Sequence, residues 1–244
     1  WKNETSYSKE ELDKVRIPDF FPEDDGIKSD FLTNYKNIER LDEQIGVIIA
    51  QLKSDGLYDN TIIFFFSDHG GPFPHYKRSI YETGLRCPMV AKWNDDAWKG
   101  NTYQLVSFVD FAPTILDAAN IKREFPFEGV SFFKKDQRRY SYAATDRFDG
   151  GTDMRRSVQD RGFKLIYNGD TTSPVYKHVK YREQMKTMRV LDSLQEKQQL
   201  NTYLSNWFSK NKDRFELYEV SEDYYEANNL IPYQKNERIF KTLQ

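Results

Sequence analysis

An aspartate and a histidine stand side by side directly after an apolar run, residues 62–66. The stretch Ser67-Asp68-His69-Gly70-Gly71 predicts two polar side chains at the end of a short β-strand, followed by two flexible glycines. In open α/β sheets, ligands bind beyond the carboxyl ends of the strands. A carboxylate there favours calcium or magnesium, and an imidazole widens the choice to zinc or manganese. An aspartate that caps a turn beside a packed histidine is the alternative, and the dipeptide alone leaves both open.

A cluster of cationic residues follows this dipeptide. The segment 75–88 contains Lys77, Arg78 and Arg86 before the chain enters another apolar stretch. A metal ion with a nearby ammonium group is suited to binding and polarising a tetrahedral oxyanion. We therefore expect Asp68 and His69 to form, together with Lys77, part of a site for an anionic tetrahedral group.

The elements that would position this site alternate between helix and strand. Apolar residues in the segment 31–52 recur at steps of three and four, which predicts an amphipathic helix packed on an apolar surface, and Gly56 would end it. Residues 61–66 lack polar alternation, as expected for a strand covered on both faces in a parallel sheet. A second short strand over 88–91 and a helix from about Phe111 follow. This order is typical of an α/β fold.

The character of the sequence changes near Glu124. Beyond it, residues 163–167 and 216–220 are strand-like and are separated by a helical stretch at 183–207. We expect residues 1–124 to belong to a catalytic α/β domain. Residues 125–244 are expected to form a smaller C-terminal subdomain with a short antiparallel sheet and a helix.

Composition excludes several classes of protein. The 36 Lys and Arg nearly balance the 38 Asp and Glu, for a formal net charge of −2. Without a basic stripe there is little reason to expect a nucleic-acid partner. No run approaches the roughly 20 apolar residues of a membrane helix, so we expect no membrane span. Cys87 is the one cysteine, which excludes an intrachain disulfide framework.

Several motifs together resemble the type I sulfatases of the alkaline-phosphatase superfamily. They are Ser67-Asp68-His69-Gly70, Lys77, Tyr81-Glu82, Gly84-Leu85-Arg86-Cys87-Pro88, residues 106–117, Glu216-Leu217-Tyr218 and residues 226–230. Their order and spacing span almost the whole chain. The stretches 71–74 and 154–159 are most similar to the heparan N-sulfatase (sulfamidase) branch and its bacterial polysaccharide-sulfatase relatives. The implied fold is the C-terminal part of a mostly parallel sheet sandwiched by helices, plus the smaller subdomain.

The resemblance implies roles for the residues of the first motif and the loop after it. Asp68 and His69 would be ligands of a calcium ion, with magnesium as the second choice. Lys77 would contact the substrate sulfate and take part in catalysis; a solvated loop lysine is the alternative.

Further residues have more weakly implied roles. His75 could contact the leaving oxygen, against the alternative of an ordinary loop histidine. Asp146 and Arg147 could bind sugar hydroxyls or a uronate, against the alternative of a salt-bridged surface turn. Tyr81 and Glu82 are expected to brace the loop rather than to touch substrate.

The nucleophile of the family does not occur in this sequence. It is a formylglycine made from Cys or Ser in a C-x-P-S-R or S-x-P-S-R motif, and neither pattern is present. The resemblance therefore implies that formylglycine and the other metal carboxylates belong to an N-terminal part of the same protein. Alone, this piece would be inactive. Without that part, the helix from Phe31 and the strand at 61–66 would expose apolar surface.

The expected function is hydrolysis of a sulfate ester or N-sulfate on a sulfated saccharide or polysaccharide. The same metal site could serve a phosphate mono- or diester hydrolase of the superfamily. A non-catalytic chain that binds sulfated glycan is the third alternative. Family resemblance implies an exported protein, which is periplasmic, secreted or lysosomal.

Overall fold

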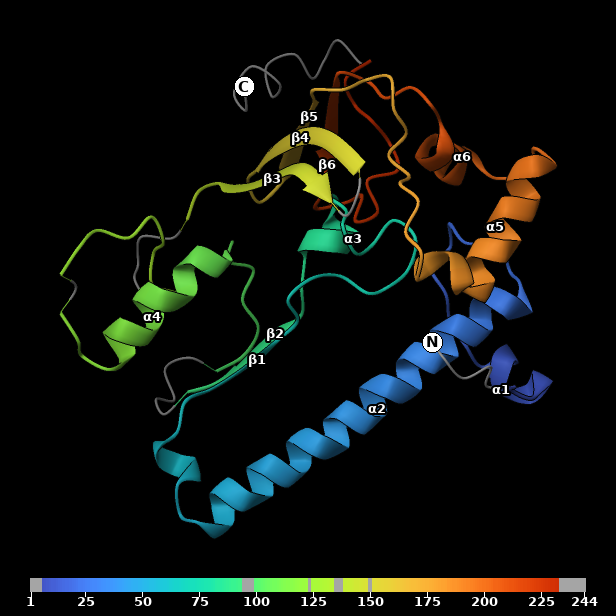
Figure 1. The fold of residues 1–244 in the computed structure, drawn as a ribbon. Helices are drawn as coiled ribbons and strands as arrows, with labels where there is room; N and C mark the ends of the chain where they lie inside the picture. The colour runs from blue at the N-terminus through green and yellow to red at the C-terminus, as the bar shows by residue number, and fades with distance from the viewer. Residues whose placement is uncertain (1–5, 94–98, 123, 134–137, 149–150, 233–244) are drawn as a thin grey trace. The chain divides into compact units, whose positions relative to one another are not determined.

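The computed structural model describes residues 6–93, 99–122, 124–133, 138–148 and 151–232 (Figure 1). The chain divides into two compact units, each assembled from separated stretches of sequence. Unit 1 consists of Trp1–Ser79, Thr83–Lys99 and Ser173–Asn211, and unit 2 of Ile80–Glu82, Gly100–Thr172 and Lys212–Gln244. The predicted boundary near Glu124 concerns the domains of a whole enzyme and stays a prediction.

Unit 1 is built mainly of helices. In chain order its elements are α1 (Lys9–Asp13), α2 (Asp25–Ser54), the 3-10 helix η1 (Tyr58–Asn60), β1 (Ile63–Phe66), β2 (Met89–Lys92), the 3-10 helix η4 (Arg182–Gln184), α5 (Lys186–Glu196) and α6 (Thr202–Phe208). The short helix α3 (Glu82–Leu85) follows the loop after β1. The predicted helical stretch at 183–207 thus forms two helices of this unit.

The ends of α2 follow from its capping residues. The Asp24 side chain accepts a hydrogen bond from the Gly26 amide at 2.7 Å and so caps the first turn. At the other end Gly56 has a φ of +67°, and the Leu57 amide donates to the Leu52 carbonyl at 2.9 Å. Only glycine adopts this conformation without strain, so the prediction that Gly56 ends the helix is confirmed.

The first turns of α2 are anchored to α5. Phe31 stacks on Phe73 with ring centres 3.9 Å apart, and Ile27 is fully buried. Asp30 accepts hydrogen bonds from the amide and the hydroxyl of Thr187 at 2.7 and 2.8 Å, which satisfies a free donor at the start of α5. These contacts fix the N-terminal end of the long helix.

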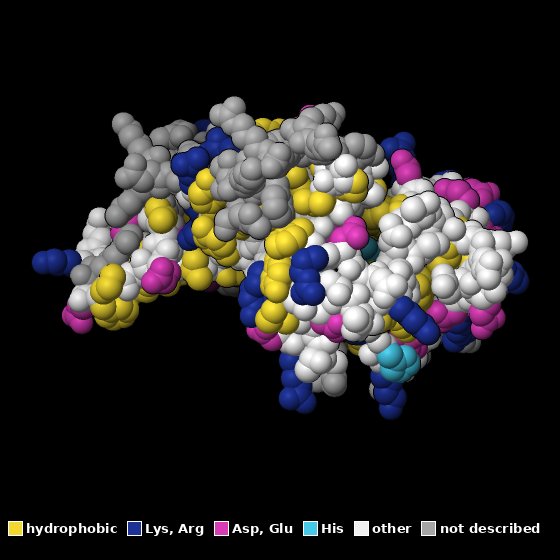
Figure 2. All heavy atoms as spheres, turned by 90° about the horizontal axis from the view of Figure 1, so that it is seen from above, with side chains coloured by type: hydrophobic (Ala, Val, Ile, Leu, Met, Phe, Trp, Pro, Cys, Tyr) yellow, Lys and Arg dark blue, Asp and Glu magenta, His cyan; other side chains and the backbone are white. Residues whose placement is uncertain are grey.

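The rest of α2 carries apolar side chains that reach solvent. Exposed fractions range from 39% to 70% for Tyr35, Ile38, Leu41, Val47 and Ile48. The helix is therefore formed as predicted, but its apolar face is not buried within the described residues. Figure 2 shows hydrophobic side chains at the surface on the face that it displays.

β1 differs from its prediction in pairing and in burial. It pairs antiparallel with β2, in the register Ile63 to Lys92 and Phe66 to Met89. Phe65 and Phe66 are 41% and 40% exposed. The α/β class is confirmed, but the parallel pairing expected for residues 61–66 is wrong within the described residues, whose two sheets are both antiparallel. Parallel pairing needs a further strand that this part of the chain does not supply.

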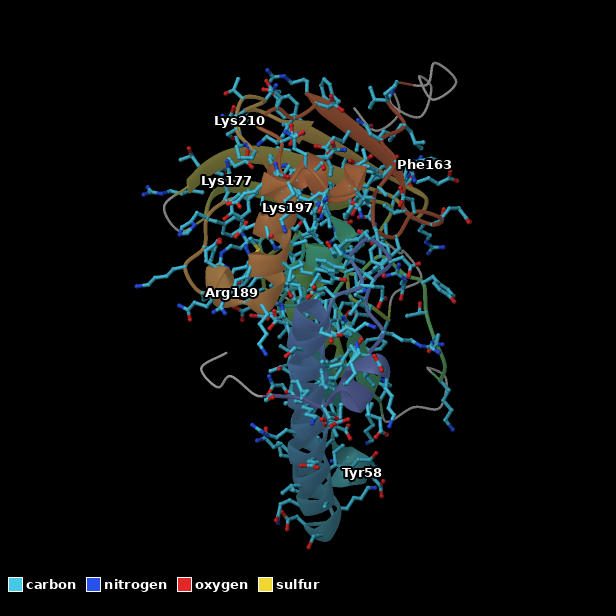
Figure 3. All side chains as sticks on the ribbon, turned by 90° about the vertical axis from the view of Figure 1, so that its right-hand side faces the viewer. Tyr58, Phe163, Lys177, Arg189, Lys197 and Lys210 are labelled. Carbon is cyan, nitrogen blue, oxygen red and sulfur yellow. The ribbon has the colours of Figure 1, made fainter. Side chains whose placement is uncertain are left out.

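Tyr58 lies beyond the C-terminal end of α2 (Figure 3). The Nζ atoms of Lys53 and Lys92 lie 4.9 and 4.6 Å from the centre of its ring, within the range of a cation–π interaction. The turn between helix and strand is thus held by side chains from α2 and β2. None of the helices in the described ranges is both long enough and apolar enough to cross a membrane.

Unit 2 is centred on a four-stranded antiparallel sheet. Its strands lie in the order β3 (Ser141–Phe148), β4 (Gly151–Gln159), β5 (Phe163–Asn168) and β6 (Phe215–Glu219). Leu165 and Leu217 pair across β5 and β6 and form the centre of its apolar core. The 3-10 helix η3 (Phe108–Asp110) and α4 (Phe111–Ala118) precede the sheet. The predicted antiparallel sheet and the helix at Phe111 are confirmed.

A lysine with two glutamates is buried in unit 2. Lys164 of β5 is fully buried, and its Nζ lies 2.7 Å from a carboxylate oxygen of Glu82 and 2.9 Å from one of Glu226. The second oxygen of Glu226 accepts a hydrogen bond from the Glu82 amide. One buried ammonium group therefore forms ion pairs with two carboxylates.

A second polar group in unit 2 links three segments of the chain. The Arg155 Nη2 lies 3.0 Å from the Tyr81 hydroxyl and 3.3 Å from Glu216, and Tyr81 donates to Glu216 at 2.7 Å. Burial and the Glu216 carboxylate hold the pKa of Tyr81 well above its ordinary value. These residues belong to the motifs that carried the family resemblance. Tyr81 and Glu82 brace the structure, as predicted.

Burial of Glu226 makes the stability of unit 2 depend on pH. Burial raises the pKa of Glu226 from 4.5 to about 7, although the Lys164 charge opposes the rise. Between these values the folded state keeps a proton that the unfolded state loses. Stability should therefore fall as pH rises from 4.5 to about 7, by on the order of 3 kcal/mol, and then level off.

Denaturation midpoints measured between about pH 5 and about pH 8 test this prediction. Glu226→Gln should flatten the dependence, because an amide does not titrate. Glu222→Gln, an exposed residue of the same segment, should keep the wild-type dependence. An unchanged slope in Glu226→Gln would contradict the assignment to this carboxyl group.

Candidate functional site

The predicted metal ligands follow β1 and face solvent. The Asp68 side chain is 82% exposed and that of His69 is 38% exposed. The Ser67 amide donates to the Pro88 carbonyl at 3.2 Å, and the Ser67 hydroxyl donates to the His69 carbonyl at 2.6 Å. These bonds shape the turn that presents the two side chains beyond the strand.

The two side chains converge on one point. The Nε2 atom of His69 lies 3.4 Å from a carboxylate oxygen of Asp68. The Nδ1 atom lies 2.8 Å from the Gly70 carbonyl, which only accepts hydrogen bonds, so Nδ1 carries a proton. In the neutral ring, Nε2 then offers a lone pair beside the carboxylate, an arrangement that a cation satisfies.

The spacing of these atoms fits a hard divalent cation. Two ligand atoms at about 2.4 Å from one ion, and at right angles, are about 3.4 Å apart. The oxygen of Asp68 and the nitrogen of His69 have this separation. Within the described ranges no group of three or more His, Cys, Asp or Glu side chains could hold a metal. The dipeptide is thus suited to supply part of a coordination sphere.

Close packing at two glycines brings the loop that carries Lys77 and the Asp68-His69 dipeptide against the same segment, residues 83–84. The Gly70 amide donates to the Gly84 carbonyl at 2.9 Å, and a Cβ on Gly70 would lie 1.9 Å from the Thr83 carbonyl oxygen. A Cβ on Gly84 would lie 2.4 Å from the Ser79 carbonyl oxygen. Residues 70 and 79 therefore both pack against residues 83–84.

Lys77 ends a loop that turns back toward the dipeptide. Its amide donates to the Gly71 carbonyl at 2.9 Å, which closes the loop over residues 71–77. Its Nζ lies 5.9 Å from the centre of the Tyr181 ring. Asp68, His69 and Lys77 thus belong to one compact loop system of unit 1, and neither Asp68 nor His69 is packed in hydrocarbon.

Unlike Asp68 and His69, His75 is buried. It is 7% exposed, its Nδ1 lies 3.2 Å from the Tyr203 hydroxyl, and its ring packs against Tyr203 and Trp207. The Thr83 hydroxyl donates to its carbonyl. This placement favours a structural role in the packing of α6 over the predicted contact with the leaving oxygen.

Asp146 and Arg147 lie on β3 of unit 2. A bulge in the pairing of β3 with β4 falls between Thr145 and Arg147. The Asp146 carboxylate forms a 2.8 Å ion pair with Arg156 and is 64% exposed, and Arg147 is also exposed. The ion pair fits the alternative of a salt-bridged surface, and saccharide binding by this pair stays a prediction. Asp149 and Gly150, which follow this strand in the sequence, lie outside the described residues.

Two residues near Lys77 were not predicted as site residues. Arg78 donates from Nη1 to the Tyr181 hydroxyl at 2.9 Å, and its Cζ lies 5.2 Å from the ring centre. Tyr181 is separated from Arg78 by 103 positions. The density of cations in 75–88 pointed toward Arg78, whereas nothing near Tyr181 in the sequence pointed to this contact.

Comparison with known proteins identifies the family. The Sulfatase family model matches residues 4–121, and the model "N-sulphoglucosamine sulphohydrolase, C-terminal" matches residues 71–210, more than half of the chain. The chain belongs to the sulfatase family. The second match confirms both the resemblance to the N-sulfatase branch and the assignment to the C-terminal portion.

The chain is similar to sulfatases from a bacterium and from human. It is 41% identical over 221 residues to an ulvan-active sulfatase of Formosa agariphila, covering 89% of the chain and 37% of that protein. It is 24% identical over 232 residues to N-sulphoglucosamine sulphohydrolase of Homo sapiens, covering 88% of the chain and 46% of that protein. The chain thus spans less than half the length of these relatives.

The fold matches that of solved sulfatase-like structures. One of them, in complex with its substrate D-glucosamine-2-N,6-O-disulfate, aligns with a TM-score of 0.57 at 21% identity. The alignment covers 88% of this chain and 38% of that one. The predicted α/β fold is thereby confirmed.

Proposed function

We propose that this chain is the C-terminal part of a sulfatase that hydrolyses sulfate esters or N-sulfate groups on a sulfated saccharide. The observation that carries the proposal is the convergence of the Asp68 carboxylate and the His69 Nε2, 3.4 Å apart, beside the loop of Lys77. The names of the relatives support a saccharide substrate. They include both a polysaccharide-active sulfatase and an N-sulfatase, so both O- and N-sulfate belong to the proposal.

The residues of this chain would bind and polarise the sulfate group. Asp68 and His69 would hold a calcium or magnesium ion, whose positive charge stabilises the sulfuryl oxygens when it is bound. Lys77 would donate hydrogen bonds from its ammonium group to the same oxygens. Because that charge grows in the transition state, a fixed ammonium group there accelerates the reaction.

The nucleophile and the remaining metal ligands would come from an N-terminal part of the same protein. The chain spans 37% of the ulvan-active relative, and it contains neither form of the formylglycine motif. The exposed apolar residues of α2 and β1 support the same proposal, because a folded protein rarely leaves such a surface uncovered. Export to the periplasm, the lysosome or the medium is proposed from the family alone.

Parallel assays of the full-length protein test the function. An aryl sulfate, N-sulfated glucosamine and an aryl phosphate are compared with and without a chelator. Turnover of a sulfated compound that stops with chelator supports the proposal. Preference for the phosphate would favour a phosphate ester hydrolase, and binding of sulfated glycan without turnover would favour a non-catalytic chain.

Lys77 offers a direct test of the predicted catalytic role. Lys77→Ala should lower kcat by about 100-fold or more, because it removes a charge that stabilises the transition state. Lys36→Ala, which removes a lysine from an exposed ion pair with Glu11, is the matched control and should keep wild-type kinetics. Wild-type kcat in Lys77→Ala would show that Lys77 is a solvated loop lysine.

A further inference from the structure

Two adjacent cationic side chains, Lys77 and Arg78, lie near the same aromatic ring. The Nζ of Lys77 and the Cζ of Arg78 lie 5.9 and 5.2 Å from the centre of the Tyr181 ring. Arg78 also donates a hydrogen bond to the Tyr181 hydroxyl at 2.9 Å. All three residues belong to unit 1. The two positive charges are therefore held close together, at a distance that a cation–π interaction allows.

The backbone explains how adjacent side chains reach the same ring. In extended chain, successive side chains point to opposite sides. Arg78 instead has a φ of +69°, in the left-handed region that residues other than glycine seldom adopt. The turn is held by the Ser79 amide, which donates to the Tyr76 carbonyl at 2.9 Å. Such conformations persist where surrounding contacts enforce them, and they occur often at binding sites.

A third cation adds to the positive charge of this loop. Arg182, next to Tyr181, is buried between the rings of Tyr176 and Trp207, with its Cζ 5.4 and 5.1 Å from their centres. Burial lowers the pKa of Arg182, the adjacent Glu183 carboxylate opposes this effect, and the positive charge of Arg78 adds to it. The aromatic rings compensate a charge that an anion near Arg78 would also stabilise.

We propose that Arg78 binds a second anionic group of the substrate, next to the sulfate that is cleaved, and that Tyr181 is the positioning residue that orients Arg78. This inference rests on the proposed function and names its substrate class: a saccharide with a second sulfate or a uronate carboxylate close to the reacting sulfate. A guanidinium group suits either group, because its N–H donors match two oxygens at once.

Steady-state kinetics of the full-length protein test the proposal. The probes are a glucosamine with one sulfate and a glucosamine with two. Arg78→Gln should raise KM for the doubly sulfated sugar by about 10-fold and change KM for the singly sulfated sugar by about 2-fold at most, with kcat unchanged for both. Tyr181→Phe keeps the ring but loses the hydroxyl, and should show the same pattern at about 3-fold.

Two controls separate binding from folding. Arg78→Lys should restore most of the affinity for the doubly sulfated sugar, because it keeps the charge. Lys180→Gln removes an exposed cation from the same segment and should change neither substrate. Thermal melts of all variants show whether any of them is unfolded.

The results that overturn the proposal are distinct from those that overturn the function. If wild type hydrolyses both sugars and Arg78→Gln lowers kcat/KM equally for both, or for neither, Arg78 does not bind a second anion. If wild type hydrolyses no sulfate, the proposed function fails. Calorimetric titration with the same two sugars then makes the same comparison, and equal loss of affinity for both, or none, overturns the second anion site.

Discussion

Replacing Lys164 with methionine should destabilise unit 2 by about 3–5 kcal/mol, because it leaves two buried carboxylates without their counter-ion. Lys164 is fully buried, and its Nζ lies within 2.9 Å of carboxylate oxygens of both Glu82 and Glu226. The aliphatic part of methionine fills much of the same space, so the loss reflects charge rather than a cavity. Hydrogen exchange of the β5 peptide in the full-length protein measures the effect locally.

Two comparisons make this prediction specific. Adding Glu82→Gln and Glu226→Gln to Lys164→Met should recover much of the lost stability, since the carboxylates are then neutral. The loss should also be smaller near pH 5, where protons neutralise Glu226, whose pKa is already raised to about 7 by burial. Lys36→Met, at an exposed pair, should leave unfolding nearly unchanged. A loss that is independent of pH and not recovered by the glutamines would contradict the electrostatic explanation.

Gly70→Ala should destabilise unit 1 and disrupt the site of Asp68 and His69. The new Cβ would lie 1.9 Å from the Thr83 carbonyl oxygen and 2.9 Å from the Gly84 Cα. Both are backbone atoms, so the chain itself must move, and we expect a loss on the order of 3 kcal/mol or more. The hydrogen bond from the Gly70 amide to the Gly84 carbonyl would be strained as well.

The neighbouring glycine provides the matched control. A Cβ on Gly71 would meet ring atoms of Phe73 at 3.4 Å and of Tyr76 at 3.8 Å, which are ordinary contacts with side chains. Gly71→Ala should therefore keep both folding and metal affinity close to wild type. Metal binding by the full-length protein is measured by calorimetry and unfolding by tryptophan fluorescence. Equal behaviour of the two variants would show that Gly70 is not needed for the geometry of the dipeptide.

The elements with strong local patterns were predictable. The three- and four-residue period of 31–52 and the glycine at position 56 predicted α2 and its end, because both features act within a few residues. Strands were predicted at 163–167 and 216–220, each within one residue of β5 and β6, because strand composition is also a local feature. The partner of each strand was harder to predict. β1 has the composition of a buried parallel strand, yet in this chain it pairs antiparallel with β2.

The candidate site was predictable only in its local part. Asp68, His69 and Lys77 lie within one loop, so their types and spacing were enough to indicate an anion site beside a cation. His75 belongs to the same loop, but its left-handed backbone and the packing of α6 bury it. The orientation of a side chain depends on the residues packed around it. When those residues are distant in the sequence, the spacing within a motif does not predict them.

The amino-acid sequence by itself determined the longer helices, four of the strands, the family motifs and the short loop that carries Asp68, His69 and Lys77, because these depend on interactions between residues close together in the chain. Only the tertiary structure decided that Tyr181 holds Arg78 beside Lys77. It also decided that Glu82 and Glu226 meet at Lys164, and that Tyr81 and Glu216 meet at Arg155, in two buried polar groups. Those contacts join segments separated by tens of residues, and burial rather than local propensity selects them.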